Sequence, residues 1–234
     1  MQQQAHNTAV LLFIRTELEE VRSKKWYSGA GYRNDLQLAS LLNRQVLSVA
    51  NASQLPTFVV SGKDQVGENF GERFTNAIQS IFEVGYHNVI ALGNDCLNLS
   101  VDHLLKANER LQSCSLVIGP AADGGAYLIG IHKSIFEEVA FKCLPWQQSS
   151  LLWELREMAH RQKASVAWLP EEKDADSSYD LKVLIKELGN HSFANILLQL
   201  TGCLVQAWPA YINPHLSYSP NDAQPQRGPP ISFN

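Results

Sequence analysis

Short apolar segments alternate with longer amphipathic segments along most of this chain, and this order constrains its fold more than any other feature. Buried strands are predicted at residues 8–14, 57–61, 88–92, 115–118, 127–131 and 165–169. Helices are predicted between them at residues 35–49, 72–84, 101–111, 150–162 and from about 177 to 188. The order indicates an α/β protein of three layers, α/β/α, with a mostly parallel sheet. Ligands of such folds bind beyond the carboxyl ends of the strands.

Residues 15–34 interrupt this order. They combine three glutamates with a basic cluster that includes Lys24 and Lys25, and a glycine-containing stretch follows at residues 28–31. This mixture predicts a long loop after the first strand.

The C-terminal part of the chain has a different composition. Six of its ten prolines lie between residues 209 and 230, which excludes a regular helix or a central strand there. We therefore predict one domain over residues 1–205 and an irregular, Pro-rich tail over residues 206–234.

Charge and cysteine usage narrow the class of protein. The formal net charge of −4 gives no basic surface for nucleic acid. The apolar run at residues 9–14 is too short to span a membrane and no basic segment precedes it, so a cytoplasmic location is expected.

The four cysteines of the chain form no C-x-x-C pair, and we expect reduced, mostly buried thiols at Cys96, Cys114, Cys143 and Cys203. The sequence leaves the oligomeric state open.

Two acidic motifs follow predicted strands. Asp95 comes just after the third strand, and Mg²⁺ prefers carboxylate oxygens completed by water and phosphate, so Asp95 is a candidate metal ligand. Asp174 and Asp176 follow the last strand and are spaced to reach one cation. The alternative is structural: Asp95 caps a turn or the helix that begins at Ser100, Asp176 is the N-cap of the next helix, and Asp180 interacts with the dipole of that helix.

The most distinctive stretch is residues 119–130, which contain Asp123, Gly124 and Gly125. Paired glycines permit positive φ and a close approach of backbone to ligand. An Asp-Gly-Gly turn alone favours a hairpin, but its flanks lead us to interpret it as a ligand loop. Asp123 then offers an acceptor and Tyr127 an aromatic surface.

Four motifs in a fixed order carry a family resemblance. They lie at residues 65–74 (QVGENFGERF), 85–95 (GYHNVIALGND), 119–130 (GPAADGGAYLIG) and 174–181 (DADSSYDL). Over roughly residues 57–185 the chain resembles a bacterial family of nucleotide-diphospho-sugar transferases, which have the glycosyltransferase A fold.

The resemblance implies a site and a cofactor. Asp95 with Asp174 or Asp176 would bind a divalent cation, Mg²⁺ or Mn²⁺, together with a nucleotide diphosphate, and the cation would act as a Lewis acid on the leaving diphosphate. Asp123 is the candidate catalytic base. The implied nucleotide- or sugar-binding residues are Arg73, Asn94, Gly124, Gly125, Lys24 and Lys25. For Arg73, a structural pairing role is an equal alternative.

The first loop departs from the family pattern. Relatives have Pro-x-x-Gly-x-x-Lys-Thr-Arg-Leu, whereas residues 17–26 here lack Pro and Gly and carry three glutamates. Three functions therefore stay open: transfer of a sugar from a nucleotide-sugar donor to an unknown acceptor, nucleotidyl transfer on the same fold, and a non-catalytic ligand-binding or interaction role. A triphosphate carries more charge and requires a stronger phosphate-binding loop than residues 17–26 offer. Sugar transfer is therefore the preferred hypothesis.

Overall fold

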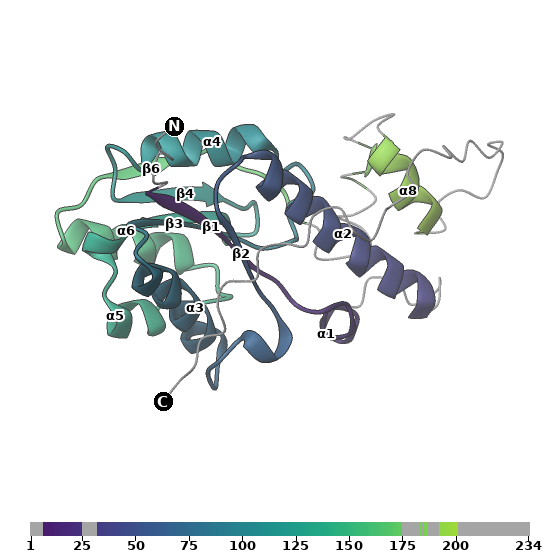
Figure 1. The fold of residues 1–234 in the computed structure, drawn as a ribbon, viewed down its shortest axis with the longest axis horizontal. Coiled ribbons are helices and arrows are strands. Elements are labelled where there is room, and N and C mark those ends of the chain that lie inside the picture. The colour runs from purple at the N-terminus through teal and green to yellow at the C-terminus, as the bar shows by residue number, and fades with distance from the viewer. Residues whose placement is uncertain (1–6, 25–31, 175–182, 184, 187–191, 201–234) are drawn as a thin grey trace.

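A six-stranded sheet forms the centre of the protein in the computed structural model, which describes residues 7–24, 32–174, 183, 185–186 and 192–200 (Figure 1). The strands are β1 (Thr8–Phe13), β2 (Thr57–Val60), β3 (Asn88–Leu92), β4 (Leu116–Pro120), β5 (Ala126–His132) and β6 (Val166–Trp168), in the order β2-β1-β3-β5-β4-β6. β5 pairs antiparallel with β3 and β4, and the other described pairs are parallel. The predicted α/β class with a mostly parallel sheet is confirmed.

Helices cover both faces of this sheet (Figure 1). One face carries α2 (Tyr32–Ala52) and α4 (Val101–Arg110), and the other carries α3 (Phe70–Val84), α5 (Glu138–Lys142) and α6 (Leu151–Arg161). Side chains alternate along the buried strand β1: Val10 and Leu12 pack in the cluster with α2 and α4, while Leu11 packs in the cluster with α3 and α6. The three-layer arrangement follows from this alternation.

The loop predicted at residues 15–34 is wrong in part. Residues Glu17–Ser23 form helix α1, which begins with a capping box. The Thr16 side chain accepts a hydrogen bond from the Glu19 backbone N–H at 3.4 Å, and the Glu19 carboxylate accepts one from the Thr16 N–H at 3.0 Å. The helix α2 also begins earlier and ends later than predicted.

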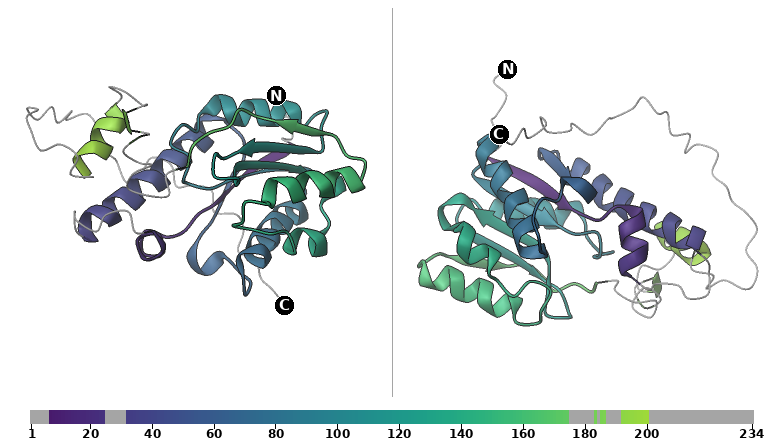
Figure 2. Two further views of the ribbon diagram at one scale, coloured as in Figure 1. Left: turned by 180° about the vertical axis from the view of Figure 1, so that it is seen from behind. Right: turned by 90° about the horizontal axis from the view of Figure 1, so that it is seen from below.

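The N-terminal half of α2 extends beyond the sheet. Figure 2 shows α1 and α8 (Ser192–Leu200) beside it. Leu38 and Leu42 of α2 pack in a third apolar cluster with Leu97 and Leu197. The sequence predicted neither α5 nor α8. The N-terminal half of α2, α1 and α8 therefore lie on one side of the carboxyl ends of the strands.

The structure bears in different ways on the expectations for the cysteines, the C-terminal segments and membrane-spanning helices. Cys143 is exposed, so the expected burial is wrong for this thiol, whereas Cys96 and Cys114 are half-buried. Cys203, most of the helix predicted near residues 177–188 and the tail at 206–234 lie outside the described residues. Within the described ranges, no helix combines the length and apolar character needed to cross a membrane.

Candidate active site

A cleft of about 750 Å³ opens at the carboxyl edge of the sheet. Its lining includes residues 13–15 at and after the end of β1, residues 91–95 at and after the end of β3, and residues 125–127 around the start of β5. The volume falls in the range of sites for small molecules and cofactors. Seven residues predicted for the site line this cleft: Lys24, Arg73, Asn94, Asp95, Asp123, Gly125 and Asp174. Gly124 does not line it, and Lys25 and Asp176 lie outside the described residues.

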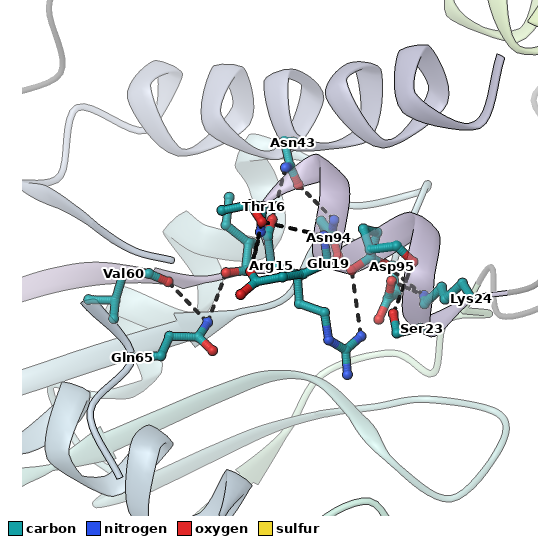
Figure 3. Close-up of polar contacts among 12 residues, drawn as sticks. Arg15, Thr16, Glu19, Ser23, Lys24, Asn43, Val60, Gln65, Asn94 and Asp95 are labelled. Atoms are coloured by element: carbon teal, nitrogen blue, oxygen red, sulfur yellow. Dashed lines mark hydrogen bonds and ion pairs between the residues drawn. The ribbon is translucent and has the colours of Figure 1, made fainter. Parts of the chain in front are cut away.

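A chain of four charges connects α1 to the end of β3. The Lys24 ammonium contacts Asp95 Oδ1 (Figure 3). It also lies 3.6 Å from Glu20 Oε1. Arg15 Nη1 lies 3.5 Å from the other Glu20 oxygen. Two positive and two negative groups thus neutralise one another at this end of the cleft.

Glu20 is the functional candidate that sequence reasoning missed. Its side chain is 1% exposed, and burial raises the pKa of its carboxyl above the ordinary value, as does the nearby Asp95, while Lys24 and Arg15 oppose the rise. The spacing of Glu20 and Lys24, four residues apart, is the signal that a helical reading of this segment would have used.

Asn94 holds the elements behind Asp95 together. Its side-chain amide donates to the Asn43 side-chain oxygen at 2.7 Å, and the Asn43 amide donates to the Arg15 carbonyl at 3.1 Å (Figure 3). These bonds join the ends of β1 and β3 to α2. The position of Asp95 is therefore fixed from behind, and the Asn94 amide is already engaged within the protein.

Main-chain pairing brings Asp174 to the same place. The segment after β6 pairs with the tip of the β4–β5 connection, where the Ala122 N–H donates to the Glu172 carbonyl at 2.9 Å. Further along, Asp174 pairs antiparallel with Cys96, the neighbour of Asp95. Burial, followed by the nearby Asp174 and Glu172 carboxylates, raises the pKa of the Cys96 thiol. Cys96 is therefore protonated at neutral pH and unsuited to be a nucleophile.

The Asp-Gly-Gly turn is a hairpin after all. Residues 121–125 join the antiparallel strands β4 and β5, and the Asp123 carboxylate accepts a hydrogen bond from the Gly125 N–H at 2.8 Å. Gly124 adopts a φ of +92°, and a Cβ there would lie 3.2 Å from Ser149. The prediction of a ligand loop in place of a hairpin is wrong, although the hairpin places Asp123 and Gly125 in the cleft.

Tyr127 does not offer the open aromatic surface that the sequence suggested. Its side chain is buried, and its hydroxyl donates to the Pro170 carbonyl at 3.1 Å. Burial raises its pKa. Its ring also lies where a Cβ at Gly119 would project, so Tyr127 packs the hairpin against the segment after β6.

Aromatic side chains line another part of the cleft. Phe13, Phe70, Phe74 and Trp146 all contribute to the lining, and we call them the aromatic wall. Their ring centroids lie 5.0 to 5.8 Å apart in five contacting pairs. The Trp146 indole N–H donates to the Phe141 carbonyl at 2.9 Å, which fixes the ring from behind.

Arg73 also lines the cleft but holds its own loop. Its Nε donates to the Gly67 carbonyl at 2.9 Å and its Nη2 to the Glu68 carbonyl at 3.3 Å. This geometry agrees with the structural alternative for Arg73, which orders the loop before α3.

The carboxylates suit a hard divalent cation. Asp95 and Asp174 line one cleft, and Asp95 already binds a positive group, the Lys24 ammonium. Among the described residues, no cluster of three or more His, Cys, Asp or Glu side chains is placed to hold a metal ion. A cation at Asp95 would therefore draw further ligands from phosphate and water, which is the habit of Mg²⁺.

Solved structures share the fold of this protein. The structure of a "putative nucleotide-diphospho-sugar transferase" from Desulfovibrio desulfuricans G20 superposes with a TM-score of 0.73 and 24% identity, covering 84% of this chain and 96% of that one. This chain thus has the fold of a nucleotide-diphospho-sugar transferase. Residues 36–148 match the family described as an uncharacterized protein conserved in bacteria (DUF2064), which confirms the family resemblance.

More distant structures share the same fold. Rv0371c from Mycobacterium tuberculosis H37Rv has a TM-score of 0.51 at 15% identity, covering 76% of this chain and 97% of that one. A 4-diphosphocytidyl-2C-methyl-D-erythritol synthase from Anaerococcus prevotii has a TM-score of 0.51 at 12% identity, covering 78% and 99%. No curated protein matches the chain.

Proposed function

We propose that this protein is a glycosyltransferase that uses a nucleotide-diphospho-sugar donor and a divalent cation, Mg²⁺ or Mn²⁺. One observation carries the proposal: Asp95, Asp174 and the hairpin with Asp123 come from distant parts of the chain and line one cleft at the carboxyl ends of the strands. This is the edge at which sheets of this kind bind ligands. The family resemblance and the transferase fold agree with it.

The side chains divide the work of binding. Asp95 and Asp174, with Asp176 close in sequence, hold the cation, which on binding supplies Lewis acidity to the leaving diphosphate. Lys24 lies beside Asp95 and is placed to neutralise a phosphate oxygen. The backbone at Gly125 and the Asp123 carboxylate face the cleft from the hairpin, on the side we assign to the sugar and its acceptor.

Nucleotidyl transfer is the second candidate, because a fold relative is a 4-diphosphocytidyl-2C-methyl-D-erythritol synthase. A triphosphate brings more negative charge than a nucleotide sugar and requires a stronger cradle. In this cleft Arg15 and Lys24 both face Glu20, which reduces the positive field available to phosphates. The charge balance therefore favours the diphosphate sugar.

A thermal-shift screen separates these functions. The purified protein is heated with UDP-, GDP-, ADP-, CDP- and dTDP-sugars and with the matching triphosphates, each with Mg²⁺, Mn²⁺ or a chelator. Ligands of the native state raise the melting temperature by mass action. A metal-dependent rise with one set of nucleotide sugars is expected, and sugar release from that donor is then measured.

Asp95→Asn tests the site itself. We expect it to remove the metal-dependent shift while changing the melting temperature of the free protein by less than about 2 °C. Asp102→Asn is the matched control, because Asp102 is an exposed carboxylate paired with Lys106 on α4. A preference for triphosphates would replace the proposal by nucleotidyl transfer. No shift with any ligand would replace it by a non-catalytic role.

A further inference from the structure

The Lys24 ammonium lies at the charged end of the cleft, which we define by Arg15, Glu20, Lys24 and Asp95. It contacts the Asp95 carboxylate, and its side chain is only 9% exposed. Lys24 is the C-cap residue that follows α1, where its backbone N–H donates to the Glu20 carbonyl at 2.9 Å. The position of its side chain is thus set by the helix that replaces the glycine-containing loop of the family pattern.

Glu20 keeps the ammonium in place. Its buried carboxylate lies 3.6 Å from Lys24 Nζ and is held on its other side by Arg15. Lys24 therefore lies between two carboxylates, one on its own helix and one at the end of β3. A single positive charge bridging two negative groups is the arrangement that a bound metal ion would otherwise provide.

We propose that Lys24 is an internal cation that competes with the divalent metal for Asp95, so that metal binding releases Lys24 from this carboxylate toward the open cleft. The inference rests on the cation site of the proposed function. Like charges a few ångströms apart repel each other, and the repulsion is greater for a divalent ion than for a monovalent one. The metal ion and the ammonium therefore compete for Asp95.

The consequence concerns the order of binding. The free protein has low affinity for the metal alone, because the metal must first displace Lys24. A metal that arrives with a diphosphate brings a new acceptor for the released ammonium. The contact between α1 and β3 thereby couples occupation of the cation site to the presence of a phosphate ligand.

The first experiment measures binding of Mn²⁺ alone by calorimetry. Lys24→Met is expected to bind Mn²⁺ at least about tenfold more tightly than the unchanged protein, since one repelling charge is removed. Lys24→Arg keeps the charge and is expected to retain the weak affinity. Lys106→Met, which removes an exposed lysine paired with Asp102 on α4, is the matched control and leaves the affinity unchanged. Equal Mn²⁺ affinity in Lys24→Met and the unchanged protein would overturn the proposal.

The second experiment uses the unchanged protein and needs no variant to fold. Lysines are acetylated with a limiting amine-reactive ester and quantified by mass spectrometry, with and without Mg²⁺. Labelling of Lys24 is expected to increase several-fold with Mg²⁺, while labelling of Lys106 stays constant. Constant labelling of Lys24 at saturating Mg²⁺ would refute the displacement. Neither readout uses a nucleotide sugar, so failure of the proposed sugar transfer is detected separately, by the nucleotide screen.

Discussion

The charged end of the cleft and the aromatic wall are built on opposite principles. At the charged end, Arg15, Glu20, Lys24 and Asp95 neutralise one another, and burial of Glu20 opposes its charge. The aromatic wall buries apolar rings against one another and carries no charge that requires a partner. Partly buried ion pairs contribute little net stability, whereas buried rings contribute much. Stability and ligand response are therefore expected to separate between the two regions.

The largest expected effect is on the aromatic wall. Phe74 is 6% exposed and contacts the rings of Phe13, Phe70, Phe141 and Trp146. Phe74→Ala leaves a cavity and is expected to lower the free energy of unfolding by about 3 to 5 kcal/mol in urea titrations. Phe74→Leu fills more of the space and costs less. A loss below about 1 kcal/mol for the alanine variant would show that the wall is not a stabilising unit.

The second-largest expected effect is at Gly71, where α3 lies close to the C-terminal end of α5 and to the loop that follows it. A Cβ at Gly71 would collide with the Lys142 carbonyl and lie 2.8 Å from Trp146 Cδ1. Gly71→Ala is expected to cost about 1 to 3 kcal/mol by overpacking, although alanine in a helix normally stabilises.

Gly93→Ala is the control for this change, since nothing lies within 4 Å of its added Cβ. Gly93 adjoins the charged end of the cleft, so the two variants compare the regions directly. Equal melting temperatures for the two proteins would contradict the close packing at Gly71.

The third effect concerns the support behind Asp95. Asn94→Ala leaves the Asn43 side chain without its 2.7 Å partner and is expected to cost about 1 to 2 kcal/mol. The double variant with Asn43→Ala should cost less than the sum of the single changes, because each removes the same bond. If the losses of stability in the two single variants add up in the double variant, the two side chains stabilise the protein independently.

The sequence predicted the strands and the covering helices other than the short α5, because their apolar spacing is regular, as in β3 and α3. The family resemblance implied that Asp95, Asp123 and Asp174 belong to one site, and all three line the same cleft. Sequence reasoning missed α1, because mixed charges there hide the capping box of Thr16 and Glu19 and the burial of Glu20. Burial of a charged residue depends on partners distant in the sequence, here Asp95 in the loop after β3, and no local pattern reports it.

The smallest expected effect is on the pH dependence of stability. It compares two neighbouring glutamates of α1, Glu20 and Glu19. Burial raises the pKa of Glu20 above 4.5, so the folded state holds a proton that the unfolded chain releases. Stability due to Glu20 is therefore present below pH 4.5 and is lost as pH rises through the folded pKa. Glu20→Gln should match the unchanged protein near pH 4 and become the more stable of the two at neutral pH.

Glu19 supplies a control of opposite sign on the same helix. Its hydrogen bonds with Thr16 lower its pKa below 4.5, so its stabilisation is present above that pH and is lost as pH falls through the folded pKa. Glu19→Gln should be the less stable protein at neutral pH and converge with the unchanged protein in acid. Urea titrations from pH 4 to 8 measure both differences. A Glu20→Gln variant that loses stability at neutral pH would mean that pairing with Lys24 and Arg15 outweighs burial, and the charged end would then stabilise the fold as the aromatic wall does.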